Sequence, residues 1–509
     1  MRRAGRVVAG VLALAVTAVA AACTPIARDP LPERTPTFGD VAPELERFYT
    51  QQIDWETCDG ADEGSYFCAS VTAPRDWDEP DAGDLSIALI MRAATSSDPL
   101  GSLLVNPGGP GASGYDLIRD STTFAVGETL MDRFDVVGFD PRGVGRSTAV
   151  HCLDAAQMDE YLFTPAAAPR GTPEWEAELT ARNEVFAEAC DTASDGILPF
   201  ITTEYAARDM DLLRALLGDE KLNYLGYSYG AYLGAVYAEL YPENVGRMVL
   251  DGGIDPSIAG VMVGARQAAG FESALRAFMA SCLGMGDCPF SGSVDQGMAQ
   301  VADMLAAADA SPVPASDGRL MDGDALSMGI ITALYNEGNW PFLASALTAA
   351  LEGDADDVFR LVDLYYGRSD GRYLDNSTEA FTAYNCMDYP ADSPEVEAEA
   401  DAIVAAQAPT FAPYWSGVDT CTSWPYPPTG TRERITAEGA DPIVLIGTTN
   451  DPATPYEWAV ALAEQLSSGV LITRQGEGHL GFNRGNACVD DAVVAYFVDG
   501  TVPTDGLTC

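Results

Sequence analysis

The sequence predicts an α/β protein with a mostly parallel β-sheet, helices on both sheet faces and a large helical insertion. Apolar β-branched runs alternate with helical segments through the first half of the chain, which is typical of parallel sheets. From about residue 255 to 439 the chain is rich in Ala, Leu, Met and Asp, with helical periodicity and few strand signals. The strand pattern resumes at 442–446 and 470–473. A sheet that is interrupted by a helical cap and then completed is the simplest explanation.

The elements expected from these patterns alternate along the chain. Strands are predicted in the first half at 86–91, 102–105, 134–139, 222–225 and 248–250. Helices are predicted at 204–217 and 231–241, and inside the insertion at 261–283, 294–308 and 343–351. The chain is therefore divided into a core of two parts, 41–254 and 440–509, with the cap insertion 255–439 between them.

Residues 1–23 have the features of an export signal. Three arginines lie within the first six residues, and 7–22 is an uncharged, Ala-rich stretch too short to span a membrane comfortably. Ordinary cleavage after the alanines and lipidation of Cys23 in a bacterial lipobox both fit this stretch. We favour lipidation, which predicts a cell-envelope protein on the outer face of the cytoplasmic membrane; the alternative is a freely secreted protein. The Pro-rich segment 24–40 is then a tether.

The cysteine count is also typical of an exported protein. The chain has 11 cysteines, so an even number remains once Cys23 is set aside for the lipid. The sequence leaves the connectivity open. Nearest-neighbour pairing would give Cys58–Cys68, Cys152–Cys190, Cys282–Cys288, Cys386–Cys421 and Cys488–Cys509.

The charge balance excludes some partners. The formal net charge is −48, from 76 acidic against 28 basic residues, so nucleic acid is not an expected partner. A membrane is expected only through the lipid anchor. An acidic, solvated surface explains the charge, and so does a salt-loving source. A further alternative is that the acidic field attracts cationic substrates such as free peptide N-termini.

A candidate nucleophile lies between a predicted strand and a predicted helix. Residues 226–230, Gly-Tyr-Ser-Tyr-Gly, match the nucleophile elbow, in which the serine occupies a strained turn between those two elements. A second match at 367–371, around Ser369, follows a helical run and leads into polar residues, so it lacks both flanking elements. Ser228 is therefore predicted as the nucleophile and Ser369 as a loop serine.

The candidate base follows from the scarcity of histidine. The chain has only His151 and His479, and an imidazole is the group best suited to take a serine proton near neutral pH. His479 follows the predicted strand 470–473, and the chain order Ser, Asp or Glu, His of hydrolase elbows selects it. His151 precedes the serine and adjoins Cys152, where packing around a disulfide explains it.

The candidate acid must lie between serine and base. Asp451 follows the strand predicted at 442–446, so its carboxylate would project from the strand's C-terminal end and orient the imidazole. The rivals are Asp251 and Asp255, which follow the preceding strand. A turn aspartate before a proline is the structural alternative for Asp451.

A glycine-rich loop is predicted to complete the site. The N–H groups of Tyr229 and Gly109, the latter in the loop 106–111, are the expected oxyanion donors. The same loop begins a formal dinucleotide fingerprint at 109–114, with Asp140 as a possible ribose acid. Pro110 removes an N–H from that turn, so no cofactor is predicted. Two unclustered histidines and the lack of a Cys-x-x-Cys motif also argue against a metal site.

Taken together, these motifs resemble a known family. The loop 106–111, the segment Asp140-Pro-Arg-Gly-Val-Gly145, the elbow 226–230 and Asp451 with His479 are similar to the actinobacterial tripeptidyl-aminopeptidase-like serine hydrolases. These are relatives of the prolyl aminopeptidases with the α/β-hydrolase fold. The resemblance covers nearly the whole mature chain, including 440–509, and implies an exopeptidase whose cap carboxylates bind the substrate's ammonium group.

The resemblance leaves several questions open. Prolyl aminopeptidases usually carry His and Gln where this chain has Pro107 and Pro141, so a strict proline preference is not expected. Glu337 and Asp388 are the candidate ammonium ligands, with solvated surface acids as the alternative. The main functional hypothesis is an exported aminopeptidase that forms an acyl-enzyme. The alternatives are a cell-envelope carboxylesterase or lipase with the same triad, and a non-catalytic lipid-anchored binding protein. The expected substrate is a peptide or a small ester.

Overall fold

The computed structural model describes residues 34–58, 65–415 and 417–509. The predicted signal peptide 1–23, with Cys23, and the tether up to residue 33 lie outside the described residues. The end of the predicted tether is docked on the core. Arg34 donates to Ser102 Oγ (2.5 Å) and forms an ion pair with Asp135, and the Thr37 N–H donates to a main-chain carbonyl of the core (2.8 Å). Residues 34–40, which the sequence analysis assigns to the tether, therefore pack on the core, because Arg34 forms an ion pair with Asp135 there.

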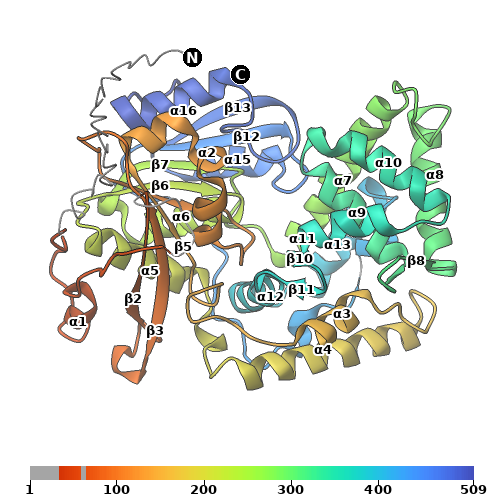
Figure 1. The fold of residues 1–509 in the computed structure, drawn as a ribbon, viewed down its shortest axis with the longest axis horizontal. Coiled ribbons are helices and arrows are strands. Elements are labelled where there is room, and N and C mark those ends of the chain that lie inside the picture. Colours follow the sequence, from red (N-terminus) through yellow and green to blue (C-terminus); the bar gives the residue numbers. More distant parts are fainter. Residues whose placement is uncertain (1–33, 59–64, 416) are drawn as a thin grey trace, which may run out of the picture. The chain divides into compact units, whose positions relative to one another are not determined.

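The core is a ten-stranded sheet with the order β1-β2-β3-β5-β4-β6-β7-β12-β13-β14 (Figure 1). The strands are β1 Glu56–Thr57, β2 Tyr66–Pro74, β3 Asp84–Arg92, β4 Ser102–Asn106, β5 Asp135–Phe139, β6 Leu222–Tyr227, β7 Val245–Asp251, β12 Ile443–Asn450, β13 Gly469–Glu477 and β14 Leu507–Thr508. Pairing is antiparallel from β1 to β5 through β2 and β3, and parallel from β5 to β14. The predicted mostly parallel sheet is confirmed, and the strands that the sequence analysis missed, β1, β2 and β14, lie at the two ends of the sheet.

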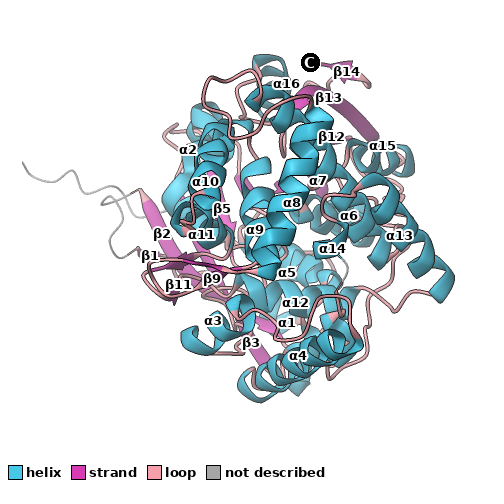
Figure 2. Cartoon of the chain, turned by 90° about the vertical axis from the view of Figure 1, so that its right-hand side faces the viewer, coloured by secondary structure: helices cyan, strands magenta, loops and turns pink. Residues whose placement is uncertain are grey.

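Helices cover both faces of the sheet (Figure 2). Val444 and Ile446 of β12 share an apolar cluster with α2 (Gly114–Arg133) and α16 (Ala487–Asp499). Leu445, which points to the opposite face, lies near α15 (Tyr456–Gln465). On that same face α6 (Tyr229–Leu240) packs so closely that a Cβ built on its Gly234 would lie 2.6 Å from Leu250 of β7. The α/β-hydrolase architecture predicted from the sequence is thus present.

The inserted segment forms a helical cap with its own core. One apolar cluster joins helices α7 to α11, which include the three helices predicted in this segment. The helices described in the inserted segment are α7 Gly260–Cys282, α8 Val294–Ala310, α9 Gly323–Leu334, α10 Trp340–Leu351, α11 Asp356–Tyr365, α12 Ser377–Asp388, α13 Pro394–Gln407 and α14 Ala412–Trp415. The 3₁₀ turn η4 (Glu337–Asn339) connects α9 to α10.

Two helices from the predicted core segment 41–254 belong to the cap instead. They are α3 (Ala155–Phe163) and α4 (Pro173–Ala193), which lie beside the cap in Figure 1. Phe163 meets Phe359 of α11 edge-on, with ring centroids 5.7 Å apart, and Arg170 forms an ion pair with Asp324 of α9. Amphipathic helices show that one face is covered, but not by which part of the chain, so the sequence could not reveal this assignment.

Five disulfides join the pairs expected from nearest-neighbour pairing. Disulfides of this number are typical of exported proteins. In the part of the chain that the structure describes, every helix is too short or too polar to cross a membrane.

Candidate active site

Ser228 occupies the turn between β6 and α6 with the backbone angles of a nucleophile elbow, φ 57° and ψ −122°. Both flanking glycines are needed at this turn. A Cβ on Gly226 would lie 2.3 Å from the Gly230 carbonyl oxygen, and one on Gly230 would lie 2.7 Å from the Asn106 carbonyl oxygen. The positive φ of Ser228 is therefore held by a backbone crossing too tight for larger side chains.

His479 and Asp451 meet at the carboxyl ends of the neighbouring strands β12 and β13. The imidazole Nδ1 lies 2.9 Å from each carboxylate oxygen of Asp451. Asp451 is 3% exposed and also accepts main-chain N–H groups from Ala453, Thr454 and Leu480. A carboxylate held in this way fixes the ring orientation and leaves Nε2 as the nitrogen able to exchange protons.

The imidazole lies against the strand end that also holds the serine backbone. The Ser228 N–H donates to the Asp251 carbonyl oxygen (2.8 Å) at the end of β7. A Cβ built on the next residue, Gly252, would lie 3.4 Å from His479 Cε1. The elbow therefore contacts the end of β7, and the end of β7 contacts the loop of His479, so all three segments lie together at one edge of the sheet.

Thr454 is a third contact of this group, and the sequence analysis did not single it out. Its hydroxyl lies 3.1 Å from Asp451 Oδ2 and 3.3 Å from His479 Nδ1. The signal available in the sequence is a hydroxyl three residues after the strand-end aspartate, where a turn brings the side chain back to the carboxylate.

The rival acid Asp251 also lies near the histidine, but it binds only backbone. Its carboxylate, fully buried, accepts the N–H groups of Gly481 (2.9 Å) and Phe482 (2.8 Å) in the loop after His479. Burial raises the pKa of Asp251 to about 6. Asp255, the other rival, accepts from Ser257 and from Gln465 Nε2. Neither rival is hydrogen-bonded to the imidazole in the part of the chain that the structure describes.

The glycine loop packs directly on the elbow. A Cβ on Gly108 would lie 2.5 Å from the Tyr227 carbonyl oxygen and 3.0 Å from both Ser228 Cβ and the Tyr229 nitrogen. Gly109, which follows, lines the same pocket as Ser228. Tyr229 begins α6, so its N–H is at a helix N-terminus and free of the helical ladder. The glycine loop and the start of α6, where the sequence predicts the two oxyanion donors, therefore both lie next to Ser228.

A cavity of about 380 Å³ opens between Ser228 and the cap. Its walls are largely aromatic and include Phe271, Tyr335, Tyr366, Phe381, Tyr414 and Trp415. Among the described residues that line it, Asp324 of α9 is the one carboxylate. The volume of this cavity and its combination of aromatic side chains with hydrogen-bonding groups are typical of small-ligand sites.

Asp324 belongs to a group of three aspartates, with Asp309 and Asp322, and Arg170 is the cation described beside them. Arg170 forms ion pairs with Asp309 and Asp324, each at 2.7 Å, and Asp322 lies close by. Burial, followed by the negative charges of Asp324 and Asp309, raises the pKa of Asp322 to about 6. The carboxylates therefore repel one another, and this end of the cavity favours a positive charge.

The two acids expected to bind an ammonium group lie elsewhere. Glu337 is exposed and lines a different pocket, beside His479. Asp388 is 4% exposed and accepts the N–H (2.9 Å) and the hydroxyl (2.6 Å) of Thr203. Burial raises the pKa of Asp388 to about 6. Its oxygens are occupied beneath the elbow, where the Thr203 hydroxyl also meets the Tyr229 hydroxyl (2.5 Å).

The remaining candidates have structural surroundings. Ser369 lies in a short hairpin of the cap, in β10 (Arg368–Ser369). His151 is exposed beside the Cys152–Cys190 disulfide. Asp140 accepts from the Ser113 hydroxyl (2.5 Å) and the Arg146 N–H (2.8 Å), so it stabilises its own loop rather than facing a ribose.

The chain is similar over most of its length to several bacterial hydrolases. Serine protease Hip1 of Mycobacterium tuberculosis is 34% identical, over 90% of this chain and 91% of the relative. Carboxylesterase B of the same species is 36% identical, over 95% of each chain. Tripeptidyl aminopeptidase of Streptomyces lividans is 31% identical, over 90% of this chain and 86% of the relative. A family model described as TAP-like protein matches residues 408–509.

Proposed function

Because the chain belongs to the tripeptidyl-aminopeptidase-like family of α/β-hydrolase serine enzymes, we propose that it is an aminopeptidase that releases short peptides or residues from free N-termini. The observation that carries this proposal is the cavity lined by both Ser228 and Asp324. A peptide whose scissile carbonyl meets the serine can extend its N-terminal part toward the acidic end of this cavity. An ester without an amine has no positive charge for Asp324 to bind, so the acidic end of the cavity does not increase its affinity.

The proposed reaction is acyl transfer. His479 takes the proton of Ser228, whose oxygen attacks the scissile carbonyl, and the N–H groups of Tyr229 and Gly109 stabilise the oxyanion. His479 then protonates the leaving amine, and water hydrolyses the acyl-enzyme with the same imidazole as base. The 2.9 Å contact between Nδ1 and Asp451 supports these roles, because it directs the other ring nitrogen to the proton transfers.

Asp324 is the proposed ligand of the substrate's ammonium group, in place of Glu337 and Asp388. Its side chain is 52% exposed, so it is open to a ligand despite its ion pair with Arg170. Asp309 and Asp322 add negative charge behind it, which the single guanidinium does not balance. A charged amine at this end of the cavity relieves that repulsion.

A carboxylesterase is the second candidate. The relative named carboxylesterase B and the aromatic walls of the cavity both favour an acyl chain in the same place. The triad chemistry of the two candidates is identical, so only the substrate separates them. The third hypothesis, a non-catalytic binding protein, predicts that Ser228 does not react with a fluorophosphonate.

We further propose that the enzyme is exported and attached to the outer face of the cytoplasmic membrane through a lipid on Cys23. The five disulfides support export. The lipobox candidate, residues 20–22, directly precedes Cys23. Cell fractionation tests the lipid anchor, since a lipid-anchored enzyme is recovered with the membranes and a freely secreted one in the medium.

One experiment separates the functional candidates. Purified protein is incubated with a free-amine tripeptide anilide, its N-acetylated counterpart and a short acyl ester. The proposal expects the free amine to be preferred over the acetylated twin, with the preference reduced in Asp324→Asn. Asp401→Asn, an exposed change on α13, is the matched control. Equal turnover of the two anilides would remove the aminopeptidase, and reaction with the ester alone would favour the carboxylesterase.

A further inference from the structure

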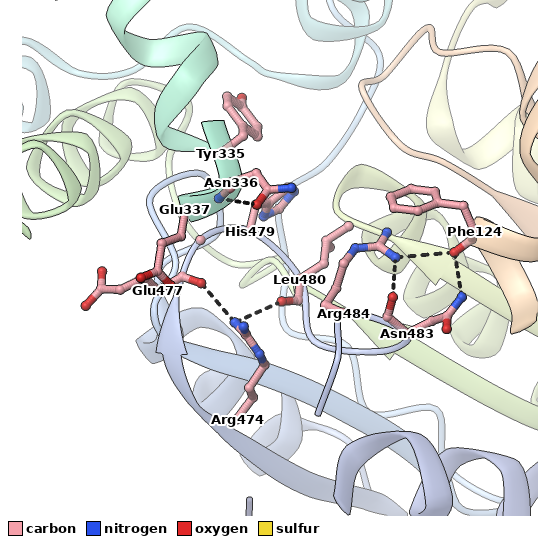
Figure 3. A pocket seen from close by; sticks show the side chains of 12 residues that line it. Phe124, Tyr335, Asn336, Glu337, Arg474, Glu477, His479, Leu480, Asn483 and Arg484 are labelled. Atoms are coloured by element: carbon pink, nitrogen blue, oxygen red, sulfur yellow. Dashed lines mark hydrogen bonds between the residues drawn. The ribbon is translucent and has the colours of Figure 1, made fainter. Parts of the chain in front are cut away.

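A second pocket, with a volume of about 700 Å³, adjoins the imidazole of His479 (Figure 3). Its walls come from the end of β13 and the loop after it, from the cap at residues 335–338 and from Phe124 of α2. Tyr335 lines both this pocket and the cavity over the serine, whereas Ser228 and Gly109 line only the latter. The two spaces therefore meet at Tyr335, whose ring stands edge-on to the imidazole, with centroids 5.4 Å apart.

The order of the reaction assigns the two spaces to different halves of the substrate. The acyl half is bonded to the serine and lies with the oxyanion donors, hence in the cavity that Ser228 and Gly109 line. The leaving half takes its proton from the imidazole and must lie within reach of His479. A pocket that contains His479 but neither the serine nor the oxyanion loop is the space available for the leaving half.

Two arginines line this pocket, whereas the described residues that line the cavity over Ser228 include Asp324 and no arginine. Arg474 donates to the carbonyl oxygens of Glu477 (3.0 Å) and Leu480 (3.5 Å). Arg484 donates to those of Phe124 (3.3 Å) and Asn483 (3.2 Å), as Figure 3 shows. Its guanidinium also stacks over the Phe124 ring at 3.9 Å. Both side chains are thus held in place by neutral partners.

Among the described residues, neither of these two arginines is held in a direct ion pair, although the Asp490 carboxylate interacts electrostatically with both. Neither guanidinium forms an ion pair with any carboxylate in the described ranges, although the chain carries 76 acidic residues. Of the two glutamates in the pocket, Glu477 is engaged by the Asn450 amide, and Glu337 lies on the cap side. A guanidinium that is held by carbonyl groups and not by a direct ion pair is pre-organised for a carboxylate.

We propose that this pocket is the leaving-group subsite and that Arg474 and Arg484 recognise a carboxylate on the leaving peptide. The carboxylate is either the free C-terminus of a short peptide or an acidic side chain next to the cleaved bond. This inference rests on the proposed aminopeptidase function and deepens it, because it states which peptides are preferred on the far side of the bond.

The test compares peptides that differ only in the leaving half. Tri-alanine followed by one alanine is offered with a free C-terminal carboxylate or a C-terminal amide. Tri-alanine followed by a glutamate amide or a glutamine amide forms the second pair. In at least one pair, kcat/KM for the charged member should exceed that of the neutral member about tenfold. The responding pair identifies the source of the carboxylate. Added salt should reduce the preference, since the pocket is open to solvent.

Variants show whether the arginines cause the preference. Arg474→Gln and Arg484→Gln should each bring the ratio toward one, and Arg474→Lys should retain part of it. Arg372→Gln, an exposed arginine of the cap, should leave the ratio unchanged. The ratio is measured within each protein, so a general loss of activity does not obscure it.

The outcomes separate the subsite from the function on which it rests. Cleavage of all four peptides with ratios near one overturns the subsite and leaves the aminopeptidase intact. A preference that survives both Gln variants also overturns it. Failure to cleave any of the peptides, with hydrolysis of a short acyl ester, overturns the aminopeptidase and the subsite together.

Discussion

Asp251, at the end of β7, and Asp451, just after β12, offer a paired test of the site. Both are candidate acids from the sequence, but in the structure only Asp451 is hydrogen-bonded to the imidazole, whereas Asp251 accepts main-chain N–H groups. In Asp451→Asn, the amide oxygen can replace Oδ1 and keep the N–H groups of Ala453 and Thr454. The amide NH₂ then faces His479 Nδ1, formerly 2.9 Å from the carboxylate. Two donors cannot share that contact, so the ring takes the tautomer with its proton on Nε2 and can no longer accept the serine proton.

The expected cost follows from that tautomer. Loss of the orienting carboxylate lowers kcat about 10⁴-fold in a serine protease, equivalent to roughly 5 kcal/mol of transition-state stabilisation. The Leu480 N–H also loses its acceptor, at about 1–3 kcal/mol of folding stability. In Asp251→Asn, one amide oxygen can keep both the Gly481 and the Phe482 N–H groups, so we expect kcat to fall only about tenfold.

The assay is steady-state hydrolysis of a free-amine tripeptide anilide at about pH 7.5, with thermal melting as the folding control. If Asp251→Asn loses as much kcat as Asp451→Asn while both proteins remain folded, then hydrogen bonds to the histidine loop matter as much as the bond to the ring. The assignment of Asp451 as the orienting acid would then fail. It would fail equally if Asp451→Asn kept a tenth or more of the unmodified activity.

Three further predictions concern the same edge of the sheet and the buried acids. Thr454→Val should lower kcat about tenfold or less while Thr454→Ser retains activity, since the hydroxyl touches both Asp451 and the imidazole. Gly108→Ala should lower kcat about a hundredfold, because its Cβ would lie 2.5 Å from the Tyr227 carbonyl oxygen; Gly318→Ala, at a similar φ but with nothing within 4 Å, should not. Burial raises the folded-state pKa of Asp388 from 3.8 to about 6, so its contribution to stability is present at low pH and is lost as the pH rises through that window. Melting temperature should therefore fall on going from mildly acidic to neutral pH, with a smaller fall in Asp388→Asn; an unchanged slope in that variant would contradict the argument.

Local sequence determined much of the elbow and of the sheet. The strand–helix junction at Ser228 and its flanking glycines form a contiguous motif, so the positive φ of the serine could be predicted. His479 and Asp451 are 28 residues apart, but each follows a strand of the same parallel sheet, and parallel strands bring their carboxyl ends to one edge.

The substrate side could not be predicted in the same way. Asp324 reaches the cavity over Ser228 only because α9 packs in the cap, and its partner Arg170 comes from a segment assigned to the core. Asp388 and Glu337 are acids of the cap, but Asp388 is buried beneath the elbow, and Glu337, at the start of η4, lines the pocket beside His479. The composition shows that acidic residues are abundant, but only the tertiary packing shows which carboxylates lie without enough positive charge around them.

The charged residues on the two sides of Tyr335 suit one orientation of a bound peptide better than the other. In the cap beside the serine cavity, Asp309 and Asp324 share Arg170, and Asp322 lies close by. Beside the histidine, Arg474 and Arg484 form no direct ion pair with the described residues. If the two spaces have the proposed roles, a peptide with an amine at one end and a carboxylate beyond the cleaved bond is favoured in one orientation, because reversing it places the amine near the arginines and the carboxylate near Asp324. That orientation puts the N-terminal half on the serine. An uncharged ester is not oriented by either end, so the same triad would act on it without this selection.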